Sequence, residues 1–210
     1  MSVDSVVILN DFCHVQGGAS RVAIDEAVAL RASGLNVIFL GAVGPVCKEL
    51  RDTGVCVLCL NQPELSEVRK HPTVAVQALW NNTARRALGS ILSGMSPRRT
   101  IVHLHGYTKA LTTAPVLAAR QAGFPTVCTL HDFFAACPNG AFYDYRREEP
   151  CRLQALSTAC MLTACDKRHP AHKAFRVARG LAQKHLARFP FTVRDYITLS
   201  EQSADLLRPY

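Results

Sequence analysis

Three short stretches carry side chains or backbone groups that could bind a polar ligand: His131-Asp132, His105 and Gly17-Gly18. Each of them follows an apolar run of the kind that forms a buried parallel strand. The carboxyl ends of parallel strands meet at one edge of a doubly wound sheet, and such folds bind their ligands at that edge. We therefore expect the three stretches to line one cleft.

The most informative segment is 124–140, which reads FPTVCTLHDFFAACPNG. A neutral histidine can donate a hydrogen bond from one ring nitrogen and accept one at the other, so His131 is suited to orienting a polar ligand. The alternative is a core strand whose His131 and Asp132 only cap the following turn. Residue types alone leave both interpretations open.

Gly17 and Gly18 lie between the first predicted strand and a predicted helix over 19–33. A strand, a glycine loop and a helix in this order present backbone N–H groups to an anion. The alternative is an ordinary tight turn. The full G-x-G-x-x-G pattern is absent from the sequence and no acidic residue closes the second strand, which disfavours a nicotinamide-dependent oxidoreductase.

The sequence contains nine cysteines and lacks the features of a signal peptide, which favours reduced thiols or metal ligands over disulfides. Four of them, which we call the cysteine set, lie in a Cys-rich insertion over about 133–168: Cys137, Cys151, Cys160 and Cys165. A structural zinc site is one interpretation, because zinc prefers four thiolate or imidazole ligands. Free buried thiols and disulfide or redox use are the others. Cys56 and Cys59 we interpret as small core residues.

Most of the net charge of +8 falls between residues 166 and 194, where eight Lys and Arg face one Asp. The pattern predicts a basic amphipathic helix over about 170–189. We expect its polar face to carry Lys173, Arg176, Arg179 and Lys184, opposite an apolar face with Phe175, Ala178, Leu181, Ala182, Leu186 and Phe189. The helix is interpreted either as a solvated face or as a dock for an anionic membrane surface. Nucleic-acid binding is disfavoured because no recognition motif is present.

Strand and helix patterns alternate along the whole chain. Strands are predicted over 5–10, 35–40, 55–60, 100–105, 124–130 and 196–200. Helices are predicted over 19–33, 46–52, 72–92, 170–188 and from 201, and a turn plus helix over 107–122. This alternation predicts an α/β fold with a doubly wound, mainly parallel Rossmann-like sheet in a single domain. No window reaches the ~20 apolar residues of a membrane span. We expect a cytoplasmic protein, peripheral at the inner membrane face if the basic helix docks there.

Four segments in this order resemble the N-terminal half of family-4-type retaining glycosyltransferases of the GT-B fold: QGGASRVAIDEAVALRASGLNVIFLG, IVHLHGY, TVCTLHDFFAACPNG and YITLSEQSADLLRPY. The resemblance spans essentially the whole chain. It implies that residues 1–210 form the N-terminal, acceptor-side domain of an enzyme with two facing Rossmann-like domains. The C-terminal, donor-binding domain is expected to be absent from this chain, which would leave it a fragment or half of a split enzyme.

The resemblance also implies a hexosyltransferase that uses a nucleotide-sugar donor and a polysaccharide or lipid-linked acceptor, with no organic cofactor. Gly17 and Gly18 would lie near the donor diphosphate, and His131, the candidate catalytic residue, would contact the transferred hexose. His105 and Asp132 would line the same cleft. Without a separate C-terminal domain chain, we expect the isolated polypeptide to be inactive or nearly so. The alternative is a non-catalytic, metal-stapled binding module.

Overall fold

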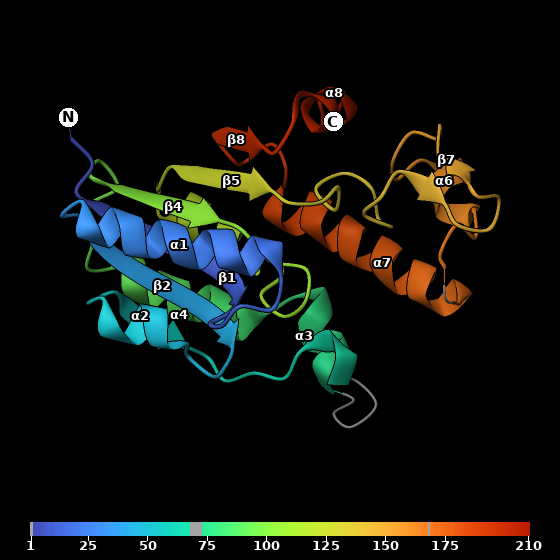
Figure 1. The fold of residues 1–210 in the computed structure, drawn as a ribbon. Coiled ribbons are helices and arrows are strands. Elements are labelled where there is room, and N and C mark those ends of the chain that lie inside the picture. The colour runs from blue at the N-terminus through green and yellow to red at the C-terminus, as the bar shows by residue number, and fades with distance from the viewer. Residues whose placement is uncertain (1, 68–72, 168) are drawn as a thin grey trace.

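The computed structural model describes residues 2–67, 73–167 and 169–210. Its centre is a sheet of six parallel strands in the order β3-β2-β1-β4-β5-β8 (Figure 1). The strands are β1 Ser5–Phe12, β2 Asn36–Val43, β3 Cys56–Cys59, β4 Thr100–Leu104, β5 Thr126–Leu130 and β8 Asp195–Thr198. The order runs outward from β1 in one direction and from β4 in the other. The predicted doubly wound, Rossmann-like sheet is therefore confirmed.

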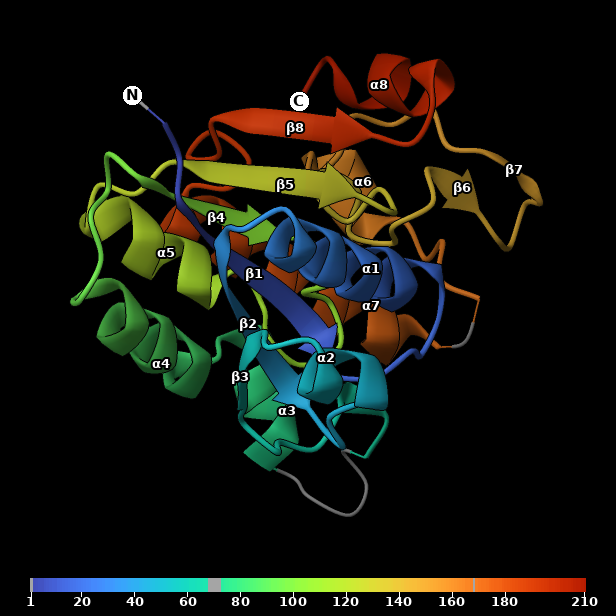
Figure 2. The ribbon, with the colours of Figure 1, turned by 60° about the vertical axis from the view of Figure 1, so that its left-hand side comes forward.

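Helices cover both faces of the sheet (Figure 2). On one face α1 (Gly18–Ala32) and α2 (Lys48–Asp52) enclose a core with Val6, Ile8 and Ile24, while α4 (Asn82–Leu92) and α5 (Ala114–Gln121) enclose the other, with Val7 and Leu88. Successive side chains of a strand point to opposite faces, so β1 is buried on both. This explains why its sequence is an almost unbroken apolar run.

The helix predicted over 72–92 is divided into α3 (Thr73–Leu79) and α4, so the prediction of one continuous helix was wrong. Its predicted first residue lies outside the described residues. The division occurs at the buried Asn81, whose side chain accepts the N–H of Ala84 at 2.9 Å and donates to the carbonyl of Ala110 at 2.8 Å. A side-chain cap of this kind starts a new helix, because it replaces the backbone bonds of a continuing one.

The segment after β5 adds small elements at one end of a long helix, away from the sheet (Figure 1). The small elements are the antiparallel pair β6 (Tyr143–Asp144) and β7 (Glu149–Pro150) and the helix α6 (Thr158–Leu162). The long helix is α7 (Pro170–Ala182), which is followed by a π-helical turn Gln183–Ala187, and α8 (Glu201–Leu207) follows β8. A 3-10 turn, Leu65–Glu67, precedes α3 in the chain. Within the described ranges, none of the helices is long and apolar enough to cross a membrane.

The basic face of α7 is turned toward the protein, contrary to the prediction. Lys173 is only 4% exposed, the Arg176 guanidinium pairs with Asp166 at 2.8 Å, and Arg179 donates to a backbone carbonyl in the loop after β4 at 2.7 Å. By contrast Leu186, which was predicted on the apolar face, is 49% exposed. The reversal has a physical reason: the surrounding segments supply acceptors for the cations, and long aliphatic stems can be buried while their charged ends are paired.

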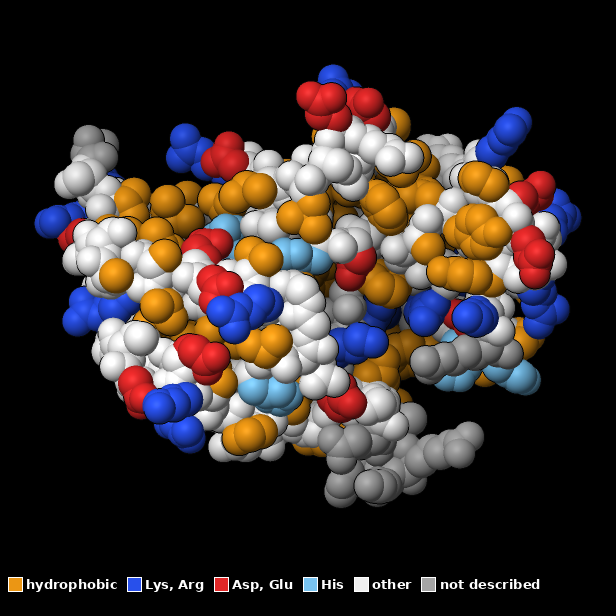
Figure 3. All heavy atoms as spheres, viewed as in Figure 1, with side chains coloured by type: hydrophobic (Ala, Val, Ile, Leu, Met, Phe, Trp, Pro, Cys, Tyr) orange, Lys and Arg blue, Asp and Glu red, His pale blue; other side chains and the backbone are white. Residues whose placement is uncertain are grey.

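This orientation removes the main physical argument for membrane docking by the basic helix, since its predicted headgroup-facing side is packed on the protein. Of the Lys and Arg residues within the predicted helix 170–189, Lys184 and Arg188 remain exposed. Figure 3 shows Lys and Arg side chains spread over the visible face and interspersed with acidic ones. On this face the basic residues are therefore not gathered into one patch of the kind that docks to anionic lipid, and docking to a membrane surface stays a prediction.

The interpretation of Cys56 as a core residue was also wrong. Cys56 is exposed because β3 is the edge strand of the sheet and only one of its faces is covered. Cys59 is partly buried and packs against the core beneath α1. The strand periodicity was therefore correct, but it did not reveal which strand lies at the edge.

Candidate functional site

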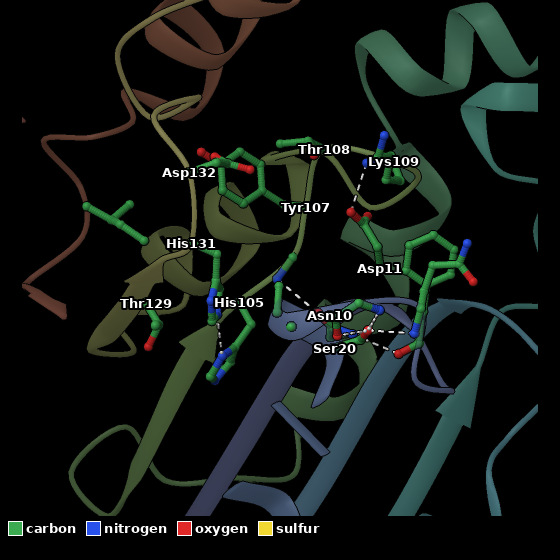
Figure 4. A pocket seen from close by; sticks show the side chains of 17 residues that line it. Asn10, Asp11, Ser20, His105, Tyr107, Thr108, Lys109, Thr129, His131 and Asp132 are labelled. Atoms are coloured by element: carbon green, nitrogen blue, oxygen red, sulfur yellow. Dashed lines mark hydrogen bonds between the residues drawn. The ribbon is translucent and has the colours of Figure 1, made fainter. Parts of the chain in front are cut away.

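A pocket of about 220 Å³ opens where β1, β4 and β5 end, beside the first turn of α1 (Figure 4). Its lining contains all five residues that the sequence placed in a cleft, namely Gly17, Gly18, His105, His131 and Asp132. The pocket lies between β1 and β4, the strands from which the sheet is wound in both directions, and this is where open α/β sheets bind ligands. The structure thus brings these residues together, while their individual roles stay predictions.

The first turn of α1 presents backbone donors to this pocket. The Ser20 hydroxyl accepts the N–H groups of Gln16 at 2.8 Å and Gly17 at 3.1 Å, which fixes the start of the helix. The N–H groups of Gly18, Ala19 and Ser20 have no partner within the helix, as in any first turn. A Cβ added at Gly17 or Gly18 would meet no atom within 4 Å, so the fold itself does not require glycine at either position. The geometry suits an anion that approaches the backbone closely.

Two histidines form the opposite side of the pocket (Figure 4). The Nε2 of His131 lies 3.2 Å from the Nδ1 of His105, and the rings are stacked with their centroids 5.5 Å apart. Burial, together with the neighbouring imidazoles, lowers the pKa of His131 to about 4, and burial also lowers the pKa of His105. Both rings are therefore neutral at neutral pH, and His131 can offer a ligand a neutral imidazole.

Glu26 on α1 supports the histidines, and the sequence analysis did not identify it. Its Oε1 lies 2.6 Å from the Nδ1 of His103, and its Oε2 lies 3.2 Å from the Nε2 of His105. Burial alone would raise the pKa of Glu26, but the two histidine contacts outweigh it and lower that pKa to about 2. The only sequence signal was a carboxylate that lies one turn after the buried Ala23 and directly before the buried Ala27.

Asp11, at the end of β1, holds the loop that forms the pocket's third side, and it too was missed. Its carboxylate accepts the N–H groups of residues 109–111 at 2.8–2.9 Å. Burial raises the pKa of Asp11 above its usual range, although these backbone bonds oppose the shift. Next to it, Asn10 accepts the N–H of Gly106 at 3.0 Å, and a Cβ at residue 106 would come within 2.7 Å of the Asn10 side-chain oxygen. The close approach explains the glycine.

The sequence left open whether Asp132 lines the cleft or caps the turn after its strand, and its position is consistent with both. Its side chain accepts the N–H of Phe134 at 3.0 Å and so caps the turn after β5, while the residue also lines the pocket. Burial raises its pKa. The Arg179 guanidinium, which lies over the Phe134 ring at 5.1 Å, opposes that rise through its charge. Helix α7 therefore contributes a partly buried cation behind the acidic side of the pocket.

Two members of the cysteine set lie against α7. Cys137, Cys160 and Cys165 are buried and Cys151 is partly buried. The Lys173 ammonium lies 3.1 Å from the Cys165 Sγ and 3.8 Å from the Cys160 Sγ. Among the described residues, one set of three or more potential metal ligands converges within 4.8 Å, and it consists of Glu26 and two histidines instead of these thiols. Zinc binding by the cysteine set stays a prediction.

The parallel, doubly wound sheet and the pocket at its switch point define a Rossmann-like α/β domain, an architecture consistent with one half of a GT-B enzyme. The family model for Glycosyltransferase Family 4 matches residues 16–210, and the chain belongs to this family. It is thus a glycosyltransferase domain. Comparison with curated proteins gave no match.

Proposed function

We propose that this chain forms the acceptor-side domain of a retaining hexosyltransferase that uses a nucleotide-sugar donor. The observation that carries the proposal is that His131 and the first turn of α1 open to the same pocket. Glycosyl transfer requires stabilisation of the charge that develops on the leaving diphosphate, and backbone N–H groups at a helix start can help to provide it. The pocket also includes Lys109, whose charge would favour the same anion.

His131 would orient the transferred hexose. Its pKa of about 4 keeps the ring neutral at neutral pH, so it can bind hydroxyl groups without repelling or attracting a charged group elsewhere on the ligand. Its neighbour Asp132, which follows the same strand β5, also lines the pocket and would contact the same ligand. We assign no catalytic base, because the retaining reaction of the resembled enzymes does not clearly use one.

The size of the pocket supports a two-domain arrangement. About 220 Å³ is less than the ~300–1,000 Å³ of a typical complete ligand site. The pocket would hold the hexose and part of the diphosphate, while a second Rossmann-like domain would hold the nucleoside. We propose a polysaccharide or lipid-linked acceptor and expect little or no turnover by the chain alone, so that multiple turnovers by the isolated chain would contradict this arrangement.

The proposal is tested by binding of a panel of nucleotide sugars, with the corresponding nucleoside diphosphates measured in parallel by NMR titration. Ligand should shift the amide signals of residues 17–20. The His131→Ala variant should lose about tenfold in affinity for the nucleotide sugar but not for the diphosphate, since one or two hydrogen bonds to the hexose are removed. His185→Ala, at an exposed histidine of the π-helical turn, is the matched control.

Failure of the whole panel to shift signals around the pocket would refute the proposal and favour the non-catalytic binding module. An equal loss for sugar nucleotide and diphosphate in His131→Ala would refute the specific role of His131.

A further inference from the structure

A continuous line of polar side chains runs behind the pocket through three elements. Thr129 on β5 lies 2.8 Å from the Nε2 of His103, whose Nδ1 lies 2.6 Å from Glu26 on α1. The other Glu26 oxygen faces the Nε2 of His105, whose Nδ1 faces the Nε2 of His131. We call this line the Glu26 network. It begins inside the sheet and ends at the pocket wall.

The Glu26 network is largely buried, so the direction of each of its hydrogen bonds affects stability. His103 is 6% exposed and His105 is 2% exposed, whereas Glu26 is partly buried and His131 reaches the pocket. An enclosed polar group that is not hydrogen-bonded costs free energy, so donors must face acceptors along the line. Glu26 is the only member whose direction is certain, because a carboxylate only accepts.

The proton positions follow outward from Glu26. Its Oε1 accepts the Nδ1–H of His103. The Nε2 of His105 makes no hydrogen bond of good geometry within the described residues, and the acceptor it faces is the Glu26 Oε2 at 3.2 Å, so we place its proton there. A neutral His105 that is protonated at Nε2 carries a lone pair at Nδ1, so the Nε2 of His131 must be the donor of that contact. The Nδ1 of a neutral His131 is then unprotonated. This atom makes no hydrogen bond to the described part of the chain and is not among its sealed-off polar atoms.

We propose that Glu26 is a positioning residue that acts through His105 to fix the tautomer of His131, so that His131 presents an acceptor to the pocket. On the basis of the proposed function, the pocket then selects a ligand hydroxyl that donates to His131 Nδ1. If the hydrogen bonds of the network ran in the opposite direction, His131 would present an N–H to the pocket instead and would favour an acceptor on the ligand. Glu26 itself does not line the pocket and so acts without touching the ligand.

Glu26, His103 and His105 could also be considered as ligands of a metal ion, because their ligand atoms lie within 4.8 Å of one another. The 2.6 Å contact between Glu26 and His103 argues against this. Two ligands held at about 2.0–2.2 Å from one tetrahedral zinc are farther apart than that, and the contact has the length of a charge-assisted hydrogen bond. The second nitrogen of His103 is already engaged by Thr129. A hydrogen-bonded network accounts for both of these contacts of His103.

The proposal is tested by ¹⁵N NMR of the histidine side chains in the chain without ligand at neutral pH, where the two ring nitrogens report the tautomer directly. The eight histidines are assigned from single His→Gln variants. The wild-type chain should show His105 and His131 protonated at Nε2 and His103 protonated at Nδ1. Adding one equivalent of Zn²⁺ should leave these signals unchanged.

The decisive variant is Glu26→Gln, which keeps the shape but offers one acceptor and one donor. The Gln oxygen should take the shorter contact to His103, leaving its NH₂ to face His105. His105 and His131 should therefore both move to the Nδ1–H tautomer. Asp25→Asn is the matched control, because it removes the same charge from the adjacent, exposed helix position and should change none of these signals.

The proposal is overturned if wild-type His131 is protonated at Nδ1 or averages between tautomers, if Glu26→Gln leaves His131 unchanged, or if Zn²⁺ coordinates His103 and His105. The wild-type spectrum decides by itself should the variant fail to fold. Because no ligand is present, these outcomes are independent of the proposed function. If that function also holds, Glu26→Gln should lower nucleotide-sugar affinity about tenfold and leave diphosphate affinity unchanged.

Discussion

Asp11 provides the sharpest test of how the pocket is built. Replacing it by Ala removes the acceptor for three backbone N–H groups. Lys109 is exposed and its N–H can turn to water, but Ala110 and Leu111 are 6% and 0% exposed. An unsatisfied buried donor costs about 1–3 kcal/mol, so two of them should lower the free energy of unfolding by about 4 kcal/mol.

Replacing Asp11 by Asn removes the charge but keeps a hydrogen-bond acceptor. The Oδ1 accepts from both Ala110 and Leu111, and the carbonyl oxygen of Asn can keep these two bonds. Only the contact to the exposed residue 109 would be lost, while the cost of burying a charge, which raises the pKa of Asp11, would be relieved. We expect a loss of no more than about 1.5 kcal/mol.

Both variants are compared with the wild type by urea unfolding, followed by circular dichroism and by the fluorescence of Trp80, the only tryptophan. Amide hydrogen exchange at residues 110 and 111 should accelerate in Asp11→Ala alone. Asp25→Ala, at an exposed position, should change stability by less than about 0.5 kcal/mol. If Asp11→Ala fell within about 1 kcal/mol of the wild type, the loop would not depend on this carboxylate and the reasoning would be refuted.

Three further predictions concern the pocket and the cysteine set. Gly18→Ala should leave the free energy of unfolding within about 1 kcal/mol, as should Gly89→Ala at an unobstructed position of α4. Only Gly18→Ala should weaken nucleotide-sugar binding, by about tenfold or more, because Gly18 lines the pocket and the proposed anion approaches its backbone closely. Equal binding by both variants would contradict the placement of the anion. The free energy of unfolding should fall as the pH drops from 6.5 toward 4, because His131 takes up a proton in the unfolded chain before it does in the folded one. It should fall further between pH 4.5 and 2, because Glu26 is protonated in the unfolded chain before it is in the folded one. In His131→Gln the loss of stability between pH 6.5 and 4 should be smaller by about 1–2 kcal/mol, after allowance for the partial exposure of the side chain. If urea unfolding showed no difference between this variant and the wild type, the lowered pKa of His131 would be ruled out. Protein purified without added zinc should contain about one equivalent if the cysteine set binds the metal, and less than about 0.2 equivalents by elemental analysis would exclude it.

The sequence was sufficient for the parallel sheet and for the residues at its strand ends. Apolar runs of strand length are required where both faces of a strand are covered, so their alternation with helical patterns predicts the fold class. The polar residues that follow such runs must emerge at the same sheet edge. This is why His105, His131 and Gly17 were placed at one cleft without coordinates, and the structure indeed has them around one pocket.

The sequence did not reveal the residues that support the site from behind. Glu26 belongs to a helix whose polar positions look solvent-facing, and Asp11 looks like part of a polar loop. Their partners lie far away in the chain: Glu26 contacts His103, and Asp11 accepts from residues 109–111. Only the packing of α1 and β1 against β4 and its loop creates these contacts, so no local pattern could have indicated them.

The same limit explains the reversed face of α7 and the exposed Cys56. Periodicity determines that Lys173, Arg176 and Arg179 share one side of a helix, but the direction that this side faces depends on what surrounds it. Here the partners include Asp166 and a loop carbonyl, which outweigh the usual preference of cations for water. In general, the sequence determined which residues share a face or a strand end, because that depends on local geometry. The tertiary structure alone decided which face is buried and which distant group completes each hydrogen bond.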